Sequence, residues 1–379
     1  MATLTLGALA RQAHRTPVQE PLPDFYFQAS AEETQAAIGV ARAALRDRLV
    51  ILGHHYQRDE IIRWADYTGD SFKLSQLAAA RSEADFILFC GVHFMAESAD
   101  ILSANHQRVI LPNMTAGCSM ADMADIYQVR DCWDQLTGLL DEKILPITYM
   151  NSAANLKAFV GERGGTVCTS SNAPAALRWA FTQAPKVLFF PDQHLGRNTG
   201  ARMGIPLEEM VLWDPFEQGG GPDCAGDALR RAKIILWKGH CSVHGRFTLE
   251  QIRQARAHYP DVNVIVHPEC TLDVVQAADD VGSTEHIVKV IGAAPSGTKW
   301  AVGTEINLVN RLAKQHPDKL IFCLDPVVCP CSTMYRIHPA YLRWALDNLV
   351  AGRVVNQVTV PPEIRHWAHV ALDRMLAVH

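Results

Sequence analysis

From about Ala31 onward, short apolar runs rich in β-forming residues alternate with segments whose apolar residues recur at helical spacing. This alternation is typical of parallel α/β units. Three of the runs end in a polar cluster and lead into a helical pattern: RLVILGHHYQ with its strand ending at His54, LPITYMNS from Leu145, and VNVIVHPEC from Val262. The pattern predicts three openings of the same strand–loop–helix kind.

The same further parts follow each opening. A short polar turn at a predicted helix start comes first: GDSFKLSQLAAA, CTSSNAPAALRWA and VGSTEHIVKVI. A third and a fourth strand come next, and every fourth strand leads to a cysteine, namely Cys118, Cys241 or Cys331. The distance from His54 to Cys118 is 64 residues, the same as from His267 to Cys331. Such self-similarity predicts three related domains around a pseudo-threefold axis.

We therefore expect an α/β fold of three homologous αβα domains with short parallel sheets. The expected parts are an N-terminal extension at 1–32 and domains at 33–128, 129–246 and 247–379. A loop-like insertion at 213–228 explains most of the extra length of the middle unit. The two helical patterns after the last cysteine, with the strand-like VVNQVTVP between them, are expected to cover the third domain. Since ligands of parallel α/β sheets bind at the carboxyl ends of the strands, these ends should converge on one site.

Composition is that of a globular protein, with 48% hydrophobic and 20% charged residues. A net charge of −5 without a Lys/Arg run argues against a nucleic-acid partner. The apolar runs are far shorter than the roughly 20 residues that cross a bilayer, so no membrane partner is expected. The N-terminus faintly resembles a transit peptide, but without an apolar signal core a frayed extension is the preferred interpretation. Ten cysteines without a secretion signal favour the cytoplasm, where clustered thiols bind metals or act in catalysis.

One cysteine per repeat brings three thiolates together: Cys118, Cys241 and Cys331. Three protein ligands leave one coordination position open, which suits either a catalytic zinc ion or one iron of a [4Fe–4S] cluster. Alternatively, they are buried small apolar residues, the usual role of free cysteines. Cys329 competes with Cys331, but the matched length of the units favours Cys331. Cys323 lies in a predicted strand and is expected in the core.

Histidines and a carboxylate accompany the strand ends. His267 and Glu269 could perform general acid/base chemistry near neutral pH, although Glu269 could equally cap the following helix. His54 and His244 also follow strand ends, but among sixteen histidines a single one indicates little.

Hydroxyl side chains mark the predicted helix starts. Ser283 and Thr284 could present hydroxyl and backbone N–H groups to a phosphate or carboxylate, or could be ordinary N-caps. Ser71 and Ser170 leave the same two possibilities open. Their recurrence in all three units is what draws attention to them.

In combination, these motifs resemble those of the quinolinate synthase family, whose members are the second enzyme of de novo NAD biosynthesis. The likeness runs from about Leu49 to Leu342 and is carried by GHHYQ, GDS, AGCSMADM, YMNS, CTSSNA, PDQHLG, KGHCSVH, HPEC, VGST, VGTE and CPCSTMYRI. The resemblance implies three αβα domains in a triangle around a [4Fe–4S] cluster, with one cysteine from each domain. Met334 follows Cys331 at the family's spacing, whereas Ser332 stands where many members have proline.

The resemblance also implies an activity, the condensation of iminoaspartate with dihydroxyacetone phosphate to quinolinate, phosphate and water. The open iron would act as a Lewis acid in dehydration. The implied partners are these two small molecules, with a functional link to an aspartate oxidase that supplies iminoaspartate.

Site residues of the first two domains are implied as well. His54, Tyr56 and Ser71 would hold the dicarboxylate end and assist proton transfer. The second domain would line the cavity with Tyr149, Asn151 and Ser170.

Five further residues carry implied roles. His244 would reach the same cavity, and His267 with Glu269 would be the acid/base pair for tautomerisation. Ser283 and Thr284 would grip the phosphate or a substrate carboxylate. Because the chain is mildly acidic, the attraction of dianionic substrates must come from local donors and helix N-termini.

Two alternatives stay open at this point. One is a mononuclear zinc lyase or aldolase that uses the same three thiolates with histidine as acid/base. The other is a redox-sensing or cluster-carrying protein with no substrate of its own.

Overall fold

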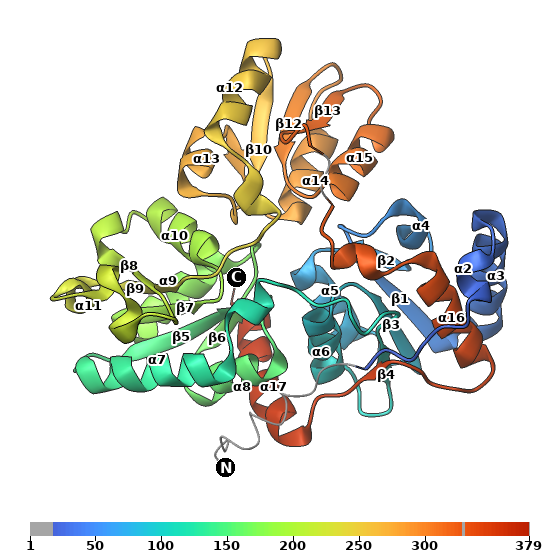
Figure 1. Cartoon of the computed structure of the whole chain (residues 1–379), viewed down its shortest axis with the longest axis horizontal. Helices are drawn as coiled ribbons and strands as arrows, with labels where there is room; N and C mark the ends of the chain where they lie inside the picture. Colours follow the sequence, from blue (N-terminus) through green and yellow to red (C-terminus); the bar gives the residue numbers. More distant parts are fainter. Residues whose placement is uncertain (1–17, 328–329, 379) are drawn as a thin grey trace.

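Three α/β domains form a triangle in the computed structural model, which describes residues 18–327 and 330–378 (Figure 1). We name the domains by their strands: the first contains β1–β4, the second β5–β9 and the third β10–β13. The expected fold of three αβα domains with parallel sheets is confirmed. The exact domain boundaries stay a prediction. Within the described ranges, no helix has both the length and the apolar character needed to cross a membrane.

The first domain holds a five-stranded sheet in the order β14-β4-β3-β1-β2. All six residues of β1 are buried, as expected for a parallel strand with helices on both faces. Its elements are α2 (Phe25–Gln28), α3 (Ala31–Leu45), η1 (Arg46–Arg48), β1 (Leu49–His54), α4 (Asp59–Ile62), β2 (Tyr67–Gly69), α5 (Ser71–Ala80), β3 (Phe86–Cys90), α6 (His93–Leu102), β4 (Arg108–Ile110) and η2 (Ala121–Met123).

The second domain holds the sheet β6-β5-β7-β9-β8, whose strands are all parallel. Its elements are α7 (Ile126–Leu139), β5 (Ile144–Tyr149), α8 (Ala154–Glu162), β6 (Thr166–Cys168), α9 (Ala173–Gln183), β7 (Lys186–Phe190), α10 (Gln193–Arg202), η3 (Leu207–Glu209), β8 (Met210–Trp213), η4 (Gln218–Gly220), η5 (Pro222–Cys224), α11 (Ala228–Arg231), β9 (Ile234–Trp237) and η6 (His244–Arg246). The edge strand β8 was not predicted. Together with the insertion at 213–228, which contains two short turns of 3₁₀ helix, it gives this unit its extra length.

The third domain holds the four-stranded sheet β11-β10-β12-β13. Its elements are α12 (Leu249–His258), β10 (Asn263–Val266), α13 (Leu272–Ala277), β11 (Asp280–Val281), α14 (Thr284–Ala293), β12 (Lys299–Gly303), α15 (Ile306–Gln315), β13 (Leu320–Cys323) and η7 (Met334–Arg336). Edge additions apart, the three sheets share one order: β2-β1-β3-β4, β6-β5-β7-β9 and β11-β10-β12-β13. The repeat read from the sequence is therefore a repeat of topology.

The C-terminal segment comprises α16 (Pro339–Val350), β14 (Gln357–Val358) and α17 (Pro362–Ala377). The expectation that it covers the third domain is wrong. β14 pairs antiparallel with β4, α16 packs on α3, and α17 packs on α8. A side chain at Gly161 of α8 would collide with the backbone of Trp367, so glycine permits this close helix contact. In Figure 1 the red helices accordingly lie with the first and second domains.

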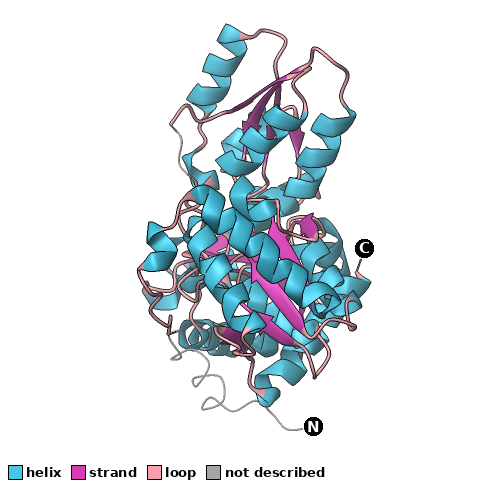
Figure 2. Ribbon diagram, turned by 90° about the vertical axis from the view of Figure 1, so that its right-hand side faces the viewer, coloured by secondary structure: helices cyan, strands magenta, loops and turns pink. Residues whose placement is uncertain are grey.

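Hydrophobic packing divides the molecule in the same way. One continuous core runs through the first domain, the second domain and the C-terminal helices. The third domain has two cores of its own, one on each face of its sheet. Figure 2 shows this domain standing above the other two.

Candidate active site

The carboxyl ends of the first strands of all three domains open into one shared cavity. β1 ends at His54, β5 ends at Tyr149, and β10 ends one residue before His267. Thirteen of the fourteen residues singled out from the sequence line it: His54, Tyr56, Ser71, Cys118, Tyr149, Asn151, Ser170, Cys241, His244, His267, Glu269, Thr284 and Cys331. The fourteenth, Ser283, is buried beside Thr284 as the N-cap of α14.

Glu269, in the loop after β10, presents a buried carboxylate to this cavity. Tyr149 Oη donates a hydrogen bond to its Oε1 at 2.5 Å, and its Oε2 lies 2.7 Å from Nδ1 of His244. Burial opposes ionisation, but His267, His244 and the two hydrogen bonds outweigh it and lower the pKa of Glu269 to about 2. Both carboxylate oxygens are thus held in place by groups from the second domain. Glu269 does not cap a helix, which removes the alternative role.

Two imidazoles and a phenol extend this hydrogen-bonded group. His244 and His267 stack with their ring centres 4.2 Å apart and their planes at 16°. Nε2 of His244 lies 3.2 Å from Tyr56 Oη, which is also 2.8 Å from Oγ1 of Thr304. Burial, reinforced by His244, lowers the pKa of His267 to about 3. His267 is therefore a neutral imidazole near pH 7, with one ring nitrogen as hydrogen-bond acceptor and the other as donor.

Three helix starts contribute hydroxyl groups to the cavity. Ser71 begins α5, Thr284 begins α14, and Ser170 precedes α9. Helix N-termini attract anions through their free N–H groups and the helix dipole. Oγ1 of Thr284 and Oδ1 of Asn151 are buried without a hydrogen-bond partner within the described residues. A polar ligand with oxygen or nitrogen atoms would satisfy these groups.

A second hydroxyl cluster joins the three domains beside these helix starts. Ser171 Oγ donates to Oδ2 of Asp70 at 2.5 Å and lies 2.9 Å from Ser283 Oγ. Asp70 caps α5 and Ser283 caps α14. Helix capping and lining of the cavity, the two roles expected at these helix starts, therefore both occur. At α5 and α14 the capping residue and the residue whose hydroxyl lines the cavity are neighbours in sequence.

The three predicted cysteines share one local geometry. Each lies three residues before a turn of 3₁₀ helix, η2, η6 or η7. In each case the backbone carbonyl of the cysteine accepts from the N–H four residues later. The backbone N–H three residues later points to each sulfur, from Ala121, His244 and Met334 respectively. Cys331 is thus the structural equivalent of Cys118 and Cys241, whereas Cys329 lies outside the described residues.

Charge and spacing at the thiols bear on what they could hold. Burial raises the pKa of Cys118 to about 12 and that of Cys331 above its usual range, so a cation is needed to keep these thiols ionised. Ligands about 2.3 Å from one zinc ion lie at most about 4.6 Å from one another. In the described part of the chain, only Cys241, His244 and Glu269 form a three-ligand group with all atoms within 4.8 Å. The three thiols are therefore too far apart to share one zinc ion in this arrangement.

Comparison with known proteins places the chain in a family. A family model described as quinolinate synthetase A protein (NadA) matches residues 39–377. The quinolinate synthase of Corynebacterium glutamicum is 60% identical over 363 residues, covering 96% of this chain and 92% of the relative. That of Streptomyces coelicolor is 53% identical over 384 residues, covering 100% and 96%. The chain belongs to the quinolinate synthase family.

Family membership settles several expectations from the sequence. The chain is an enzyme of NAD biosynthesis, as the motifs indicated. The alternative of a redox sensor or cluster carrier without a substrate is wrong.

Cys323, expected in the core, lies in β13 and packs against both cores of the third domain while staying partly exposed.

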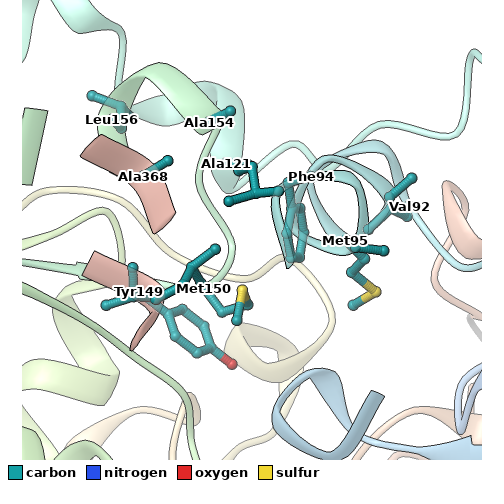
Figure 3. Packing of buried hydrophobic residues seen from close by; sticks show 14 of the residues in the cluster. Val92, Phe94, Met95, Ala121, Tyr149, Met150, Ala154, Leu156 and Ala368 are labelled. Atoms are coloured by element: carbon teal, nitrogen blue, oxygen red, sulfur yellow. The ribbon is translucent and has the colours of Figure 1, made fainter. Parts of the chain in front are cut away.

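One apolar wall of the quinolinate synthase cavity was missed. Phe94 and Met95, in the first turn of α6, line the cavity together with Val92. Figure 3 shows them across the boundary from Tyr149 and Met150 of the second domain, with which they share the continuous core. No role was assigned to these residues from the sequence, and only the fold shows that they face the cavity.

Polar neighbours were missed as well. Asp70 lines the cavity, and Thr304 connects Tyr56 to the third domain. Glu305 is buried and accepts the backbone N–H of Cys331 at 3.2 Å. Burial raises the pKa of Glu305 to about 7. The GDS and VGTE motifs contain these residues, so the motifs were a signal, although no individual role was assigned to them.

Proposed function

We propose that the enzyme condenses iminoaspartate with dihydroxyacetone phosphate in this cavity and releases quinolinate, phosphate and water. The observation that carries the proposal is the convergence of thirteen predicted residues, drawn from three separate repeats, on one cavity. An aspartate oxidase would supply the unstable imine. The substrates together carry two carboxylates and a phosphate, which fits a cavity lined by helix starts and hydroxyl groups.

We further propose that Cys118, Cys241 and Cys331 hold a [4Fe–4S] cluster. Their equivalent turns, with a backbone N–H directed at each sulfur, suit thiolate ligands, and the three sulfurs do not all lie within 4.8 Å of one another, which favours a cluster over one ion. When bound, the cluster supplies an iron without a protein thiolate, which can act as a Lewis acid in dehydration.

The residues of the chain would bind the substrates and move protons. Ser71 and Thr284, at the starts of α5 and α14, would bind a carboxylate and the phosphate through hydroxyl and backbone N–H groups. Asn151 and Ser170 would add contacts from the second domain. His54, fully buried, would hold the dicarboxylate end, since its pKa is lowered by burial and it can donate as a neutral imidazole.

Proton transfer would centre on Glu269. This ionised carboxylate faces the cavity between Tyr149 and His244, so it can accept a proton from a substrate carbon and return it to nitrogen or oxygen. The neutral His267 stacked on His244 would take part as the second acid/base group. Tyr56 would orient His244 through its hydroxyl group.

A single-metal enzyme is the second candidate, favoured by the group Cys241, His244 and Glu269. In that case a zinc ion would displace the hydrogen bond between His244 and Glu269. Metal analysis of anaerobically prepared protein separates the two: about four irons per chain with brown colour supports the cluster, and one zinc in colourless protein supports the alternative.

The test uses cysteine variants of the anaerobically prepared holoenzyme. Cys331→Ser should lose most of the iron and all quinolinate formation from iminoaspartate and dihydroxyacetone phosphate, because one thiolate ligand is missing. Cys323→Ser and Cys329→Ser are the matched controls and should keep both. Iron retention in the first variant with loss in Cys329→Ser would reassign the ligand, and a fully loaded wild type that forms no quinolinate would refute the proposed reaction.

A further inference from the structure

The helix after the third strand of each domain contacts the loop after the first strand of the next domain. These helices are α6, α10 and α15, and the sixth residue of each makes such a contact: Ser98, Asn198 and Arg311. The contacts run in a cycle, from the first domain to the second, from the second to the third, and from the third to the first. The loops they reach carry the site residues Tyr149, Glu269 and Tyr56 at or near the contact.

The contact from α10 encloses Glu269. The side-chain amide of Asn198 donates to the carbonyl of Pro268 at 2.8 Å and to the carbonyl of Cys270 at 2.7 Å. Both partners are acceptors, so the amide nitrogen must face them. Asn198 is 1% exposed, so both hydrogen bonds lie in the interior. Glu269 thus sits between two backbone groups that the second domain holds in place.

The contact from α15 encloses Tyr56 in the same manner. The guanidinium of Arg311 donates to the carbonyl of His55 at 2.8 Å and to the carbonyl of Gln57. It also binds Asp59 at 2.9 Å, which fixes the guanidinium plane. The residue between the two carbonyls is Tyr56, whose hydroxyl reaches His244 and the third domain.

The contact from α6 lies at the equivalent position of its domain but is made by different chemical groups. Ser98 Oγ lies 3.4 Å from the sulfur of Met150, and Glu97 accepts the backbone N–H of Ala154 at 2.9 Å. Met150 lies in the loop that follows Tyr149, and Ala154 begins α8 at the end of that loop. The first and second domains share a hydrophobic core, and Met150 of this loop belongs to it.

We propose that Asn198 and Arg311 are positioning residues that hold Glu269 and Tyr56 in their working geometry from a neighbouring domain. Neither side chain is among the cavity-lining residues, so neither touches substrate. The proposal rests on the proposed function for its kinetic consequence only, because the restraint of each loop can be measured without turnover. Proton transfer depends on placement within a fraction of an ångström, which is why a remote restraint matters.

The first test replaces Asn198 by leucine, which keeps the volume and removes both donors. Thr199→Val is the matched control, since Thr199 is buried in the same helix and its hydroxyl donates to the carbonyl of Leu195 within that helix. Amide hydrogen exchange of the peptide spanning 267–271 should become about tenfold faster in Asn198→Leu and stay unchanged in the control. Exchange elsewhere in α10 and β7 should be unaffected.

Kinetics on the same loaded proteins give the second readout. Asn198→Leu should lower kcat by about 10- to 100-fold and change KM by less than about threefold, because Glu269 is displaced while the binding hydroxyls stay. The iron content should equal that of the wild type. Unchanged exchange of 267–271, or a kcat equal to that of Thr199→Val, would overturn the proposal for Asn198.

Arg311→Lys with the control Lys314→Met provides an independent pair, useful also if Asn198→Leu fails to fold. Lys314 binds the same Asp59 from the same helix but touches no carbonyl beside Tyr56. Arg311→Lys should speed exchange of the peptide spanning 55–59 and lower kcat, whereas Lys314→Met should do neither. Equal behaviour of the two variants would refute the proposal. If the wild type forms no quinolinate, the exchange data still decide whether the restraint exists, and the proposed function fails separately.

Discussion

The interface between the first and second domains differs in kind from the interface that the third domain makes with both. The first is apolar: one continuous core crosses it and includes the C-terminal helices. The second consists largely of hydrogen bonds, among them Tyr149 to Glu269, Ser171 to Ser283, and the pairs made by Asn198 and Arg311. The third domain keeps its own two cores.

The two kinds of interface have different roles in building the site. Apolar burial is non-directional, so it can fuse two domains into a stable body without fixing individual side chains. Hydrogen bonds are directional, and those at the third domain end on the groups proposed for proton transfer. The joined first and second domains thus act as a scaffold, and the third domain brings Glu269 and His267 to it through contacts that orient them.

The largest effect is expected where the polar interface meets the chemistry. Glu269→Gln keeps the size of the side chain but removes the proton acceptor, so kcat for quinolinate formation should fall by about 10²- to 10⁴-fold. Iron content and the unfolding midpoint should stay close to the wild type. Steady-state assays of the anaerobic holoenzyme measure this.

Glu285→Gln is the control for that variant. Glu285 is another carboxylate at the boundary of the third domain, 2.9 Å from His55 Nε2, and it does not line the cavity. We expect its kcat to stay within about threefold of the wild type, since partly exposed pairs contribute little. Equal losses in the two variants would mean that any charge at this boundary matters equally.

A core substitution sharpens the comparison from the apolar side. Leu372 of α17 is fully buried in the shared core, and Leu372→Ala should lower the free energy of unfolding by about 2–5 kcal/mol. Hydrogen exchange should accelerate in both the first and the second domain. Leu312→Ala, in a core of the third domain, should cost a similar amount but accelerate exchange in that domain alone. If both variants accelerated hydrogen exchange in the same domains, the division between the shared core and the cores of the third domain would be contradicted.

The smallest effect concerns a lysine inside the apolar interface. Lys157 of α8 is fully buried and binds the carbonyl of Ser152, and burial lowers its pKa to about 7, with Glu97 opposing the shift. From about pH 7 upward the unfolded chain holds this proton and the native chain does not, so native stability rises with pH until the ordinary lysine pKa is reached.

The corresponding measurement compares wild type and Lys157→Met by denaturant unfolding at pH 7.5 and pH 9. Stability of the wild type relative to the variant should increase by up to about 1.4 kcal/mol per pH unit, the limiting slope for one proton. A difference that stays constant with pH would show that Lys157 is charged in the native state throughout.

Much of the scaffold was predictable because it repeats. The spacing of His54 and Cys118, matched by His267 and Cys331, placed equivalent residues at equivalent strand ends, and the shared strand order brings them to one cavity. Strand ends and cysteines could therefore be found by counting. Glu269 was ambiguous in sequence because a carboxylate after a strand suits capping as well as catalysis.

Contacts between domains were not predictable in the same way. The apolar faces of α16 and α17 indicate burial but not which domain buries them, so their placement was wrong. β8 is only four residues long, which is too short to show a periodic pattern of hydrophobic and polar residues. Asn198 and Arg311 lie on the polar faces of ordinary helices, and only the packing of domains shows that they reach a neighbouring loop.

The most direct test of the central claim is a crystal structure of the anaerobic holoenzyme with quinolinate bound. We expect quinolinate in the cavity shared by the three domains, with a carboxylate at the start of α5 or α14 and the ring within reach of Glu269 and Tyr149. We also expect a cluster on Cys118, Cys241 and Cys331. Quinolinate bound within a single domain, away from Glu269, would contradict this expectation.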